Sequence, residues 1–272
     1  MNVSLSSAAE GSSYVGPAHI GDEAICIDGL SFRYPDGTLA LETIDLHVAA
    51  GSTLAVIGPN GAGKTTLLKI LLGILHGYEG QVLVAGMSPG QARHRGDVVS
   101  WVPQRQSSRW DFPLTVRQVV RMGLVGRTGM FRRHSREDLD TVERIMEVLG
   151  VQAIAERCIG ELSGGQQQLA VIARALAPHP AILMLDEPTV GVDQAGQERF
   201  VGLTQQLRRQ FGLTLVIVSH DLRTVLNTCQ RIVCLNRTLH FHDAPERLSS
   251  ELLFRVFNCS LKGVFPVTGE QH

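Results

Sequence analysis

The feature that most constrains the fold is a glycine-rich segment between an apolar run and a helix-like run. It fits the pattern G-x-x-x-x-G-K-[ST], and its residues are Gly58, Pro59, Asn60, Gly61, Ala62, Gly63, Lys64 and Thr65. Between a strand and a helix, such a loop surrounds phosphate oxygens with backbone N–H groups. Lys64 would then reach the β- and γ-phosphates and the Thr65 hydroxyl would bind Mg²⁺, with Thr66 as the last nucleotide-binding residue of the segment. A glycine-rich turn without a ligand is the alternative, and the flanking strand and helix argue against it.

Two adjacent carboxylates end a second apolar run. Residues 181–185 lead directly into Asp186 and Glu187. Two neighbouring carboxylates at the end of a buried strand are costly without a cation. We expect Asp186 to hold Mg²⁺, directly or through water, and Glu187 to polarise an attacking water. The competing interpretation is a capped helix start, since Pro188 and Thr189 follow.

Three apolar runs end at residues that can bind a ligand or take part in a reaction. They are 54–57 before the glycine-rich loop, 181–185 before the carboxylates, and 213–219 before His220 and Asp221. Nearly continuous apolar strands indicate a parallel sheet that is buried on both faces. Ligands of such sheets bind beyond the carboxyl ends of the strands, so the three runs predict one shared site.

A third motif reads Leu162-Ser163-Gly164-Gly165-Gln166. Ser163 followed by Gln166 is a capping-box pattern, and apolar residues recur downstream at helical spacing. The motif therefore predicts a glycine-rich helix start whose N–H groups can bind an anion. A capped helix without a ligand is the alternative; it explains Ser163 and Gln166 but not the two glycines.

Composition limits the possible partners and location of the protein. The chain has 272 residues, of which 44% are hydrophobic and 19% charged, and a net charge of −1. These values are ordinary for a soluble α/β protein and give no support for a nucleic-acid partner. No apolar run approaches the length of a membrane span. The five cysteines lack CxxC pairing and are interpreted as reduced, mostly buried thiols of a cytoplasmic protein: Cys26, Cys158, Cys229, Cys234 and Cys259.

The chain divides into three parts. Residues 1–24 are rich in Ser, Gly and Ala and are expected to form a disordered tail rather than a signal peptide. Residues 25–248 form the main domain. It begins with an antiparallel β portion at 25–48, with a turn at Pro35-Asp36-Gly37, and contains a helical subdomain at about 105–165. Residues 249–272 form a short C-terminal extension.

Taken together, the three motifs resemble the ATP-binding cassette (ABC) subunits of membrane transporters over roughly residues 25–248. The resemblance implies an α/β P-loop NTPase with a mostly parallel core sheet, an antiparallel β subdomain and an inserted helical subdomain. It also implies an ATPase that uses ATP and Mg²⁺ and works as a head-to-tail homodimer. The signature loop of one subunit, with Ser163, Gly164, Gly165 and Gln166, would close over the nucleotide held by the other.

The remaining landmarks of the family can be placed one by one. Tyr34 matches the aromatic residue that stacks on adenine, although a core or turn tyrosine is the simpler alternative. Gln104 resembles the glutamine that contacts Mg²⁺ and water and reports the nucleotide state to the membrane partner. Asp193 matches the loop that crosses the dimer interface. His220 matches the switch histidine that contacts the γ-phosphate, whereas an isolated histidine after a strand is usually a cap or core residue.

One position departs from the family pattern. Three residues after the signature glutamine the family usually has arginine, whereas this chain has Leu169. A polar contact of the signature helix is therefore in question, and we expect ATP hydrolysis to be reduced but not absent.

The helical subdomain suggests the cargo. Residues 109–116, Met122-Gly123, 131–133 and 137–138 resemble subunits that drive manganese, zinc or iron uptake, as does Leu235-Asn236-Arg237. The resemblance implies integral membrane permease subunits, an extracytoplasmic metal-binding protein, and a location on the inner face of the cell membrane. ATPases of ferric-chelate, haem or cobalamin importers are the nearest alternatives, and neither the metal nor the direction of transport follows from the sequence.

Other candidate features have simpler explanations. His240, His242 and Asp243 could form a metal site, but a solvated surface turn is favoured. The basic residues between Arg132 and Arg136 are interpreted as a solvated face near lipid or the permease. ABC ATPases outside transport would need long coiled-coil heptads or a second cassette, and the chain has neither.

Overall fold

The computed structural model describes residues 21–104, 112–129, 132–190 and 194–257. Its centre is a six-stranded sheet in the order β5-β6-β7-β3-β8-β9. The first five strands are parallel and β9 joins antiparallel to β8. The strands are β5 (Val99–Val102), β6 (Ile182–Asp186), β7 (Thr214–Val218), β3 (Thr53–Ile57), β8 (Arg231–Asn236) and β9 (Thr238–Asp243). The apolar runs of the sequence therefore form neighbouring parallel strands, as predicted.

The central strand β3 is buried on both faces. Ala55 and Ile57 pack into a core shared with the helices on one side. Leu54 and Val56 pack on the other side against α1 (Lys64–Leu71) and the second sheet. This double burial explains why residues 54–57 are apolar without interruption, because alternating side chains enter two different cores.

The second sheet is antiparallel and has the order β2-β1-β4. β1 spans Glu23–Arg33, β2 spans Leu39–Ala49 and β4 spans Glu79–Val84. The turn between β1 and β2 closes with a hydrogen bond from the Tyr34 amide to the Thr38 carbonyl, and Gly37 there has φ 86°. The antiparallel β portion predicted at 25–48 is confirmed, and it gains β4 as a third strand.

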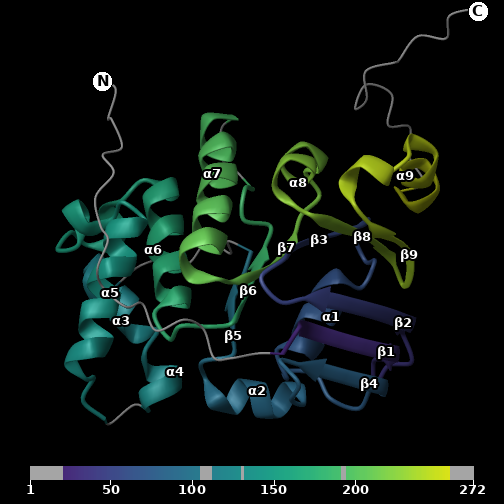
Figure 1. Cartoon of the computed structure of the whole chain (residues 1–272), viewed down its shortest axis with the longest axis horizontal. Coiled ribbons are helices and arrows are strands. Elements are labelled where there is room, and N and C mark those ends of the chain that lie inside the picture. The colour runs from purple at the N-terminus through teal and green to yellow at the C-terminus, as the bar shows by residue number, and fades with distance from the viewer. Residues whose placement is uncertain (1–20, 105–111, 130–131, 191–193, 258–272) are drawn as a thin grey trace, which may run out of the picture.

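Helices gather at the end of the molecule opposite the antiparallel sheet (Figure 1). They are α3 (Val116–Met122), α4 (Val125–Thr128), α5 (Arg136–Val148), η1 (Gln152–Ile154), η2 (Ile159–Glu161) and α6 (Gly164–Leu176). α3 packs against both α5 and α6. These helices occupy much of the expected insertion at 105–165, of which 105–111 and 130–131 lie outside the described residues.

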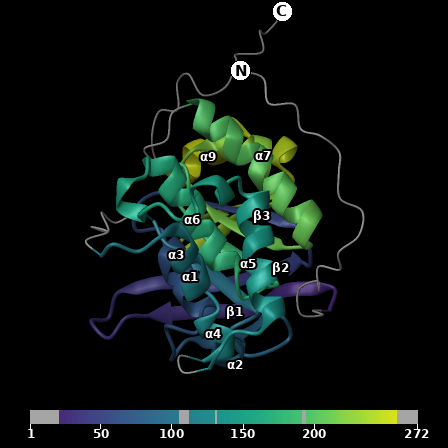
Figure 2. The same ribbon diagram turned by 90° about the vertical axis from the view of Figure 1, so that its left-hand side faces the viewer.

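The remaining helices complete the two layers around the central sheet. They are α2 (Pro89–Arg95), α7 (Gln194–Phe211), α8 (Leu222–Thr228), η3 (Pro245–Arg247) and α9 (Ser250–Phe257). Figure 2 shows α7 and α9 above the sheet and α1 below it. Within the described residues, no helix has the length and apolar character that crossing a bilayer requires.

Candidate nucleotide site

A cavity of about 720 Å³ opens where β3, β6 and β7 end. Its walls contain most of the residues singled out in the sequence: Tyr34, Gly58, Pro59, Asn60, Gly61, Ala62, Gly63, Lys64, Thr65, Thr66, Gln104, Asp186, Glu187 and His220. Residues separated by more than 180 positions thus meet at one edge of the sheet. This edge is the one at which parallel sheets place their ligands.

Glycine is required in the loop because neighbouring backbone lies very close. A Cβ at Gly58 would stand 2.0 Å from the Leu235 carbonyl oxygen, and one at Gly63 would stand 2.6 Å from that of Ala40. Gly63 also has φ 95°, a conformation that glycine adopts without strain. The loop is therefore clamped between β2 and the end of β8, with its backbone free to approach a ligand.

Lys64 lies at the start of α1 and turns back over the loop. Its Nζ donates hydrogen bonds to the carbonyl oxygens of Gly58 and Pro59, at 2.8 and 2.9 Å. Partial burial lowers the pKa of Lys64, and the nearby charges of Glu187 and Asp186 oppose that shift. The ammonium group thus faces the two carboxylates across the cavity and is held over the loop.

Asp186 ends β6 and is only 6% exposed. Burial raises the pKa of this carboxyl group, the charge of Glu187 raises it further, and Lys64 and Lys69 partly offset the effect. The two lysines therefore compensate the charge of this buried carboxylate and its neighbour only in part. The environment of Asp186 fits a divalent cation, which would supply the remaining charge.

Glu187 follows Asp186 with a strained backbone. Its φ is 48°, a left-handed conformation that costs a non-glycine residue about 1–3 kcal/mol. The strained turn is held by a 2.8 Å hydrogen bond from the Glu187 amide to the Val218 carbonyl. It directs the carboxylate towards His220, whose Nδ1 lies 2.7 Å from Glu187 Oε2. The geometry joins the ends of β6 and β7 in one acid–imidazole pair.

Tyr34 and Gln104 reach the cavity from its rim. The Tyr34 hydroxyl lies 2.9 Å from Thr66 Oγ1, and its ring meets Phe32 edge-on with centroids 5.0 Å apart. The ring is therefore fixed beside the glycine-rich loop rather than being a freely rotating turn residue. Gln104 is exposed and follows β5, so it lines the cavity from the side of the helical subdomain.

The third motif does not line this cavity. Ser163 caps α6 and its hydroxyl accepts from the Gln166 amide, while Gln166 Oε1 accepts from the Ser163 amide at 3.1 Å. The predicted capping box is therefore confirmed. Ser163, Gly165 and Gln166 line a separate cavity of about 390 Å³, together with Leu169 and apolar side chains of α7. Within one chain, the nucleotide loop and the signature loop belong to different surfaces.

Four residues that shape the nucleotide cavity escaped the sequence analysis: Thr38, Leu39, Ala40 and Phe257. A fifth, Arg237, was noted there only for its resemblance to metal-uptake subunits. Arg237 donates its backbone N–H to the Ala62 carbonyl and has φ 62°. Nothing in the local sequence marks it as a support of the loop. Asp193, expected at the dimer interface, lies outside the described residues.

The candidate metal ligands His240 and Asp243 have neighbouring polar partners, and the cysteines differ in burial. His240 Nε2 lies 3.1 Å from Thr238 Oγ1, and Asp243 pairs with Arg247 at 2.7 Å, so these groups have local partners. Cys229 and Cys234 are buried thiols whose pKa burial raises to about 12. Cys26 and Cys158 are only partly buried, contrary to the expectation that most of the thiols lie in the core.

Comparison with known proteins places this geometry in a family. The sequence profile described as "ABC transporter" matches residues 41–190. The "Probable metal transport system ATP-binding protein" of Chlamydia trachomatis is 38% identical over 244 residues, which cover 89% of this chain and 92% of that protein. The manganese transport system ATP-binding protein MntA of Synechocystis is 38% identical, covering 79% and 82%. The zinc transport system ATP-binding protein TroB of Treponema pallidum is 40% identical, covering 78% of each chain.

A solved structure agrees with this assignment. CbiO1 of Clostridium perfringens, part of the ABC transporter complex cbiONQ, superposes with a TM-score of 0.75. It is 25% identical, and the match covers 86% of this chain and 94% of that one. With the nucleotide cavity, the capped signature helix and these relatives in agreement, the chain belongs to the ATP-binding subunits of ABC transporters and has the fold of an ABC ATPase.

Proposed function

We propose that this chain hydrolyses ATP as one of two ATPase subunits that power the uptake of a transition metal ion, manganese, zinc or iron. The observation that carries the proposal is the convergence of the glycine-rich loop, Gln104, Asp186, Glu187 and His220 on one cavity. The relatives named as manganese and zinc transport subunits support the choice of cargo.

The cavity fits a nucleotide triphosphate. The tight approach of backbone at Gly58 and Gly63 leaves the loop N–H groups as the natural donors to phosphate oxygens. Lys64, now bonded to two loop carbonyls, would exchange these neutral acceptors for phosphate oxygens, which bind an ammonium more strongly. Tyr34 stands at the rim, where an adenine ring can stack on it.

The carboxylates fit Mg²⁺. Asp186 would hold the ion, with Thr65 and Gln104 as further oxygen ligands from the opposite walls of the cavity. When bound, Mg²⁺ neutralises phosphate charge and orients the transferred group. Asp186 is buried beside Glu187, so a divalent cation would add to the charge compensation that Lys64 and Lys69 give in part.

Glu187 and His220 would carry the proton chemistry. Glu187 would accept a hydrogen bond from the attacking water and draw its proton, because its turn presents the carboxylate at the cavity wall. His220 is 2.7 Å from that carboxylate and would hold it in place while contacting the γ-phosphate. Lys64 and the loop amides would stabilise the charge that develops on the phosphate oxygens.

The second half of the site comes from a second copy of the chain. Ser163, Gly164, Gly165 and Gln166 open α6 on a surface separate from the nucleotide cavity. A head-to-tail homodimer would bring this helix start against the γ-phosphate of the opposite cavity, where its N–H groups favour negative charge. Asp193 would lie at the same interface.

A groove beside β5 would receive the membrane permease. It has a volume of about 380 Å³ and is lined by Val99, Ser100 and Trp101 of β5 and by residues of α3 and α6. Met122 is 50% exposed there, and Trp101 Nε1 is buried without a hydrogen-bond partner in the described part of the chain. Since Gln104 follows the same strand into the nucleotide cavity, β5 links the cavity to the groove.

In this proposal the chain is a cytoplasmic subunit, held at the inner face of the membrane by its permease. An extracytoplasmic metal-binding protein would deliver the cargo, and nucleic acid has no part in the system. A ferric-chelate, haem or cobalamin importer is the alternative cargo class.

The test is metal uptake in cells that lack this chain. Cells complemented with the wild-type chain should regain accumulation of radiolabelled Mn²⁺, Zn²⁺ or iron, and cells complemented with Glu187→Gln should not. Restored uptake of a ferric chelate, haem or cobalamin alone would move the proposal to the alternative class. Unchanged uptake of all of these, with ATPase activity intact, would refute the transport role while leaving the ATPase assignment in place.

A further inference from the structure

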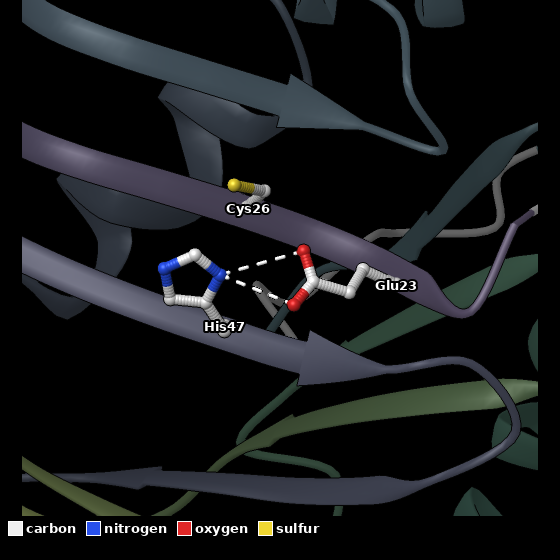
Figure 3. A group of neighbouring side chains, drawn as sticks. All are labelled: Glu23, Cys26 and His47. Atoms are coloured by element: carbon white, nitrogen blue, oxygen red, sulfur yellow. Dashed lines mark hydrogen bonds and ion pairs between the residues drawn. The ribbon is translucent and has the colours of Figure 1, made fainter.

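A second group of polar side chains lies on the outer face of the antiparallel sheet. Glu23 and Cys26 project from β1 and His47 from β2 (Figure 3). The ligand atoms of these three residues all lie within 4.8 Å of one another. In the described ranges this is the only group of three or more His, Cys, Asp or Glu side chains with such spacing. None of the three lines the nucleotide cavity.

An irregularity in β1 creates the group. Glu23 pairs with Ala49 and Ile25 pairs with Val48, so two steps along β1 match one step along β2. Ala24 and Ile25 are consequently both buried, and Glu23 emerges on the same face as Cys26. Regular alternation would place residues three apart on opposite faces. The bulge therefore redirects Glu23 towards Cys26 and its cross-strand partner His47.

Asp28 supports two of the three side chains from behind. Its Oδ1 lies 3.3 Å from His47 Nε2, and its Oδ2 accepts a hydrogen bond of 3.4 Å from Cys26 Sγ. Nδ1 faces Glu23 Oε1 at 3.3 Å, so each ring nitrogen lies beside a carboxylate. With a proton held on Nε2 by Asp28, Nδ1 would exchange its contact with Glu23 for a bond to a metal ion. Metal-binding histidines are oriented in this way by a carboxylate on the far ring nitrogen.

We propose that Glu23, Cys26 and His47 bind a Zn²⁺ ion, with water as the fourth ligand. Thiolate, imidazole and carboxylate form a donor set that zinc favours, whereas manganese favours oxygen ligands. Tetrahedral zinc with bonds of about 2.0–2.3 Å needs ligand atoms about 3.2–3.8 Å apart, which small side-chain rotations provide. The Cys26 thiol gives up its proton to solvent as the Zn–S bond forms.

A simple ion pair on a solvated face does not account for the whole arrangement. It would explain Glu23 beside His47, whose side chains are 52% and 48% exposed. It leaves unexplained why the Cys26 thiol lies beside the carboxylates of both Glu23 and Asp28. A bound cation removes this conflict, because it stabilises the thiolate and the carboxylates together. The ion would join β1 to β2 at the end of the strand pair opposite the Tyr34 turn.

The proposal is tested on the untagged, reduced full-length chain without nucleotide. Titration with Zn²⁺ should show one high-affinity site, and Co²⁺ should give an intense tetrahedral visible spectrum with a sulfur-to-cobalt charge-transfer band. Cys26→Ser should abolish that band, and Cys26→Ser or His47→Gln should weaken zinc binding by more than about 100-fold. Asp28→Asn, which touches only the supporting carboxylate, should weaken it by about 10–100-fold.

Matched controls give the outcome that would overturn the site. Cys158→Ser alters another partly buried thiol far along the chain and should leave zinc affinity and the cobalt spectrum unchanged. Mn²⁺ at the same concentration should not displace Co²⁺. If Cys26→Ser or His47→Gln binds zinc as tightly as the wild type, or if no stoichiometric site appears, the proposal is wrong.

Discussion

The glycine-rich loop and the signature loop both precede a helix, yet they are built in opposite ways. At Gly58 and Gly63 an added Cβ would stand within 2.6 Å of backbone from elsewhere in the chain. At Gly165 an added Cβ meets nothing within 4 Å. The first loop is enclosed by its own subunit, and the second presents its glycine to open space.

This contrast indicates whether each loop is shaped by its own subunit or completed by another one. An enclosed loop is shaped by contacts that exist in the folded monomer, so it can bind phosphate by itself. A glycine with open space around it has no role in the packing of its own subunit. In our proposal that space is filled by the nucleotide of a second copy.

The largest effect is expected for Glu187→Gln. The amide keeps the size of the side chain but cannot take a proton, and removal of a general base typically costs about 10²–10⁴-fold in rate. ATP affinity should remain within a few-fold, and the dimer should persist with bound ATP. Single-turnover hydrolysis and size-exclusion chromatography measure the two effects. A rate near that of the wild type would remove Glu187 from its proposed role.

Two alanine substitutions test the contrast directly. Gly58→Ala forces a Cβ against the Leu235 carbonyl, so we expect loss of ATP binding and destabilisation by several kcal/mol. Gly165→Ala should change stability by less than about 1 kcal/mol and leave ATP binding by the monomer intact, while lowering hydrolysis by the dimer. Nucleotide titration and urea denaturation separate the two. Equal loss of binding in both variants would show that the loops are not built differently.

A smaller and opposite effect on stability is expected for Asp186→Asn. Burial raises the pKa of Asp186 above its ordinary value of 3.8, so the folded state holds this proton more tightly than the unfolded state. Stability is therefore lost as pH rises through the interval between the two pKa values. Without nucleotide, the variant should be more stable than the wild type at neutral pH by roughly 0.5–2 kcal/mol, while hydrolysis is lost. The advantage should shrink when denaturation is repeated near pH 4.5.

The smallest effect is expected for Leu169→Arg. Leu169 lines a cavity that combines apolar side chains of α6 and α7 with polar ones, among them Ser163 and Gln166. If the missing arginine limits turnover, the variant should raise ATPase activity by a few-fold at a modest cost in stability. Steady-state ATPase assays of the dimer decide this. Activity at or below that of the wild type would mean that leucine at this position does not restrain the enzyme.

Local sequence was enough to predict the parts of the fold and site that depend on local chemistry. The apolar strands, the glycine-rich loop, the paired carboxylates and the capping box of α6 each have a short-range signature. The strands are marked by burial on two faces, the glycine-rich loop by backbone freedom, and the start of α6 by side-chain capping. Those elements appear at the expected places and in the expected sheet.

The parts that depend on distant backbone could not be predicted. The backbone N–H of Arg237 donates a hydrogen bond to the Ala62 carbonyl from about 175 positions away along the chain. The positive φ of Arg237 is visible only in the structure and has no counterpart in the local sequence. The grouping of Glu23, Cys26 and His47 depends on a β-bulge, which places Glu23 and Cys26 on the same face of β1 and which has no signature in the local sequence. Apolar residues continue to Leu75, yet α1 ends at Leu71, because Gly73 adopts a positive φ against the Pro89 backbone.

The position of β3 in the sheet has a consequence for how the protein is made. β3 lies between β7 and β8, so the strand that carries the phosphate loop pairs only with segments more than 150 residues later. During synthesis the loop emerges from the ribosome long before the backbone of Leu235 and Arg237 that shapes it. The nucleotide pocket should therefore be one of the last features to form on the nascent chain. Products truncated before β8 should retain the β1–β2 pair but have no capacity to bind ATP.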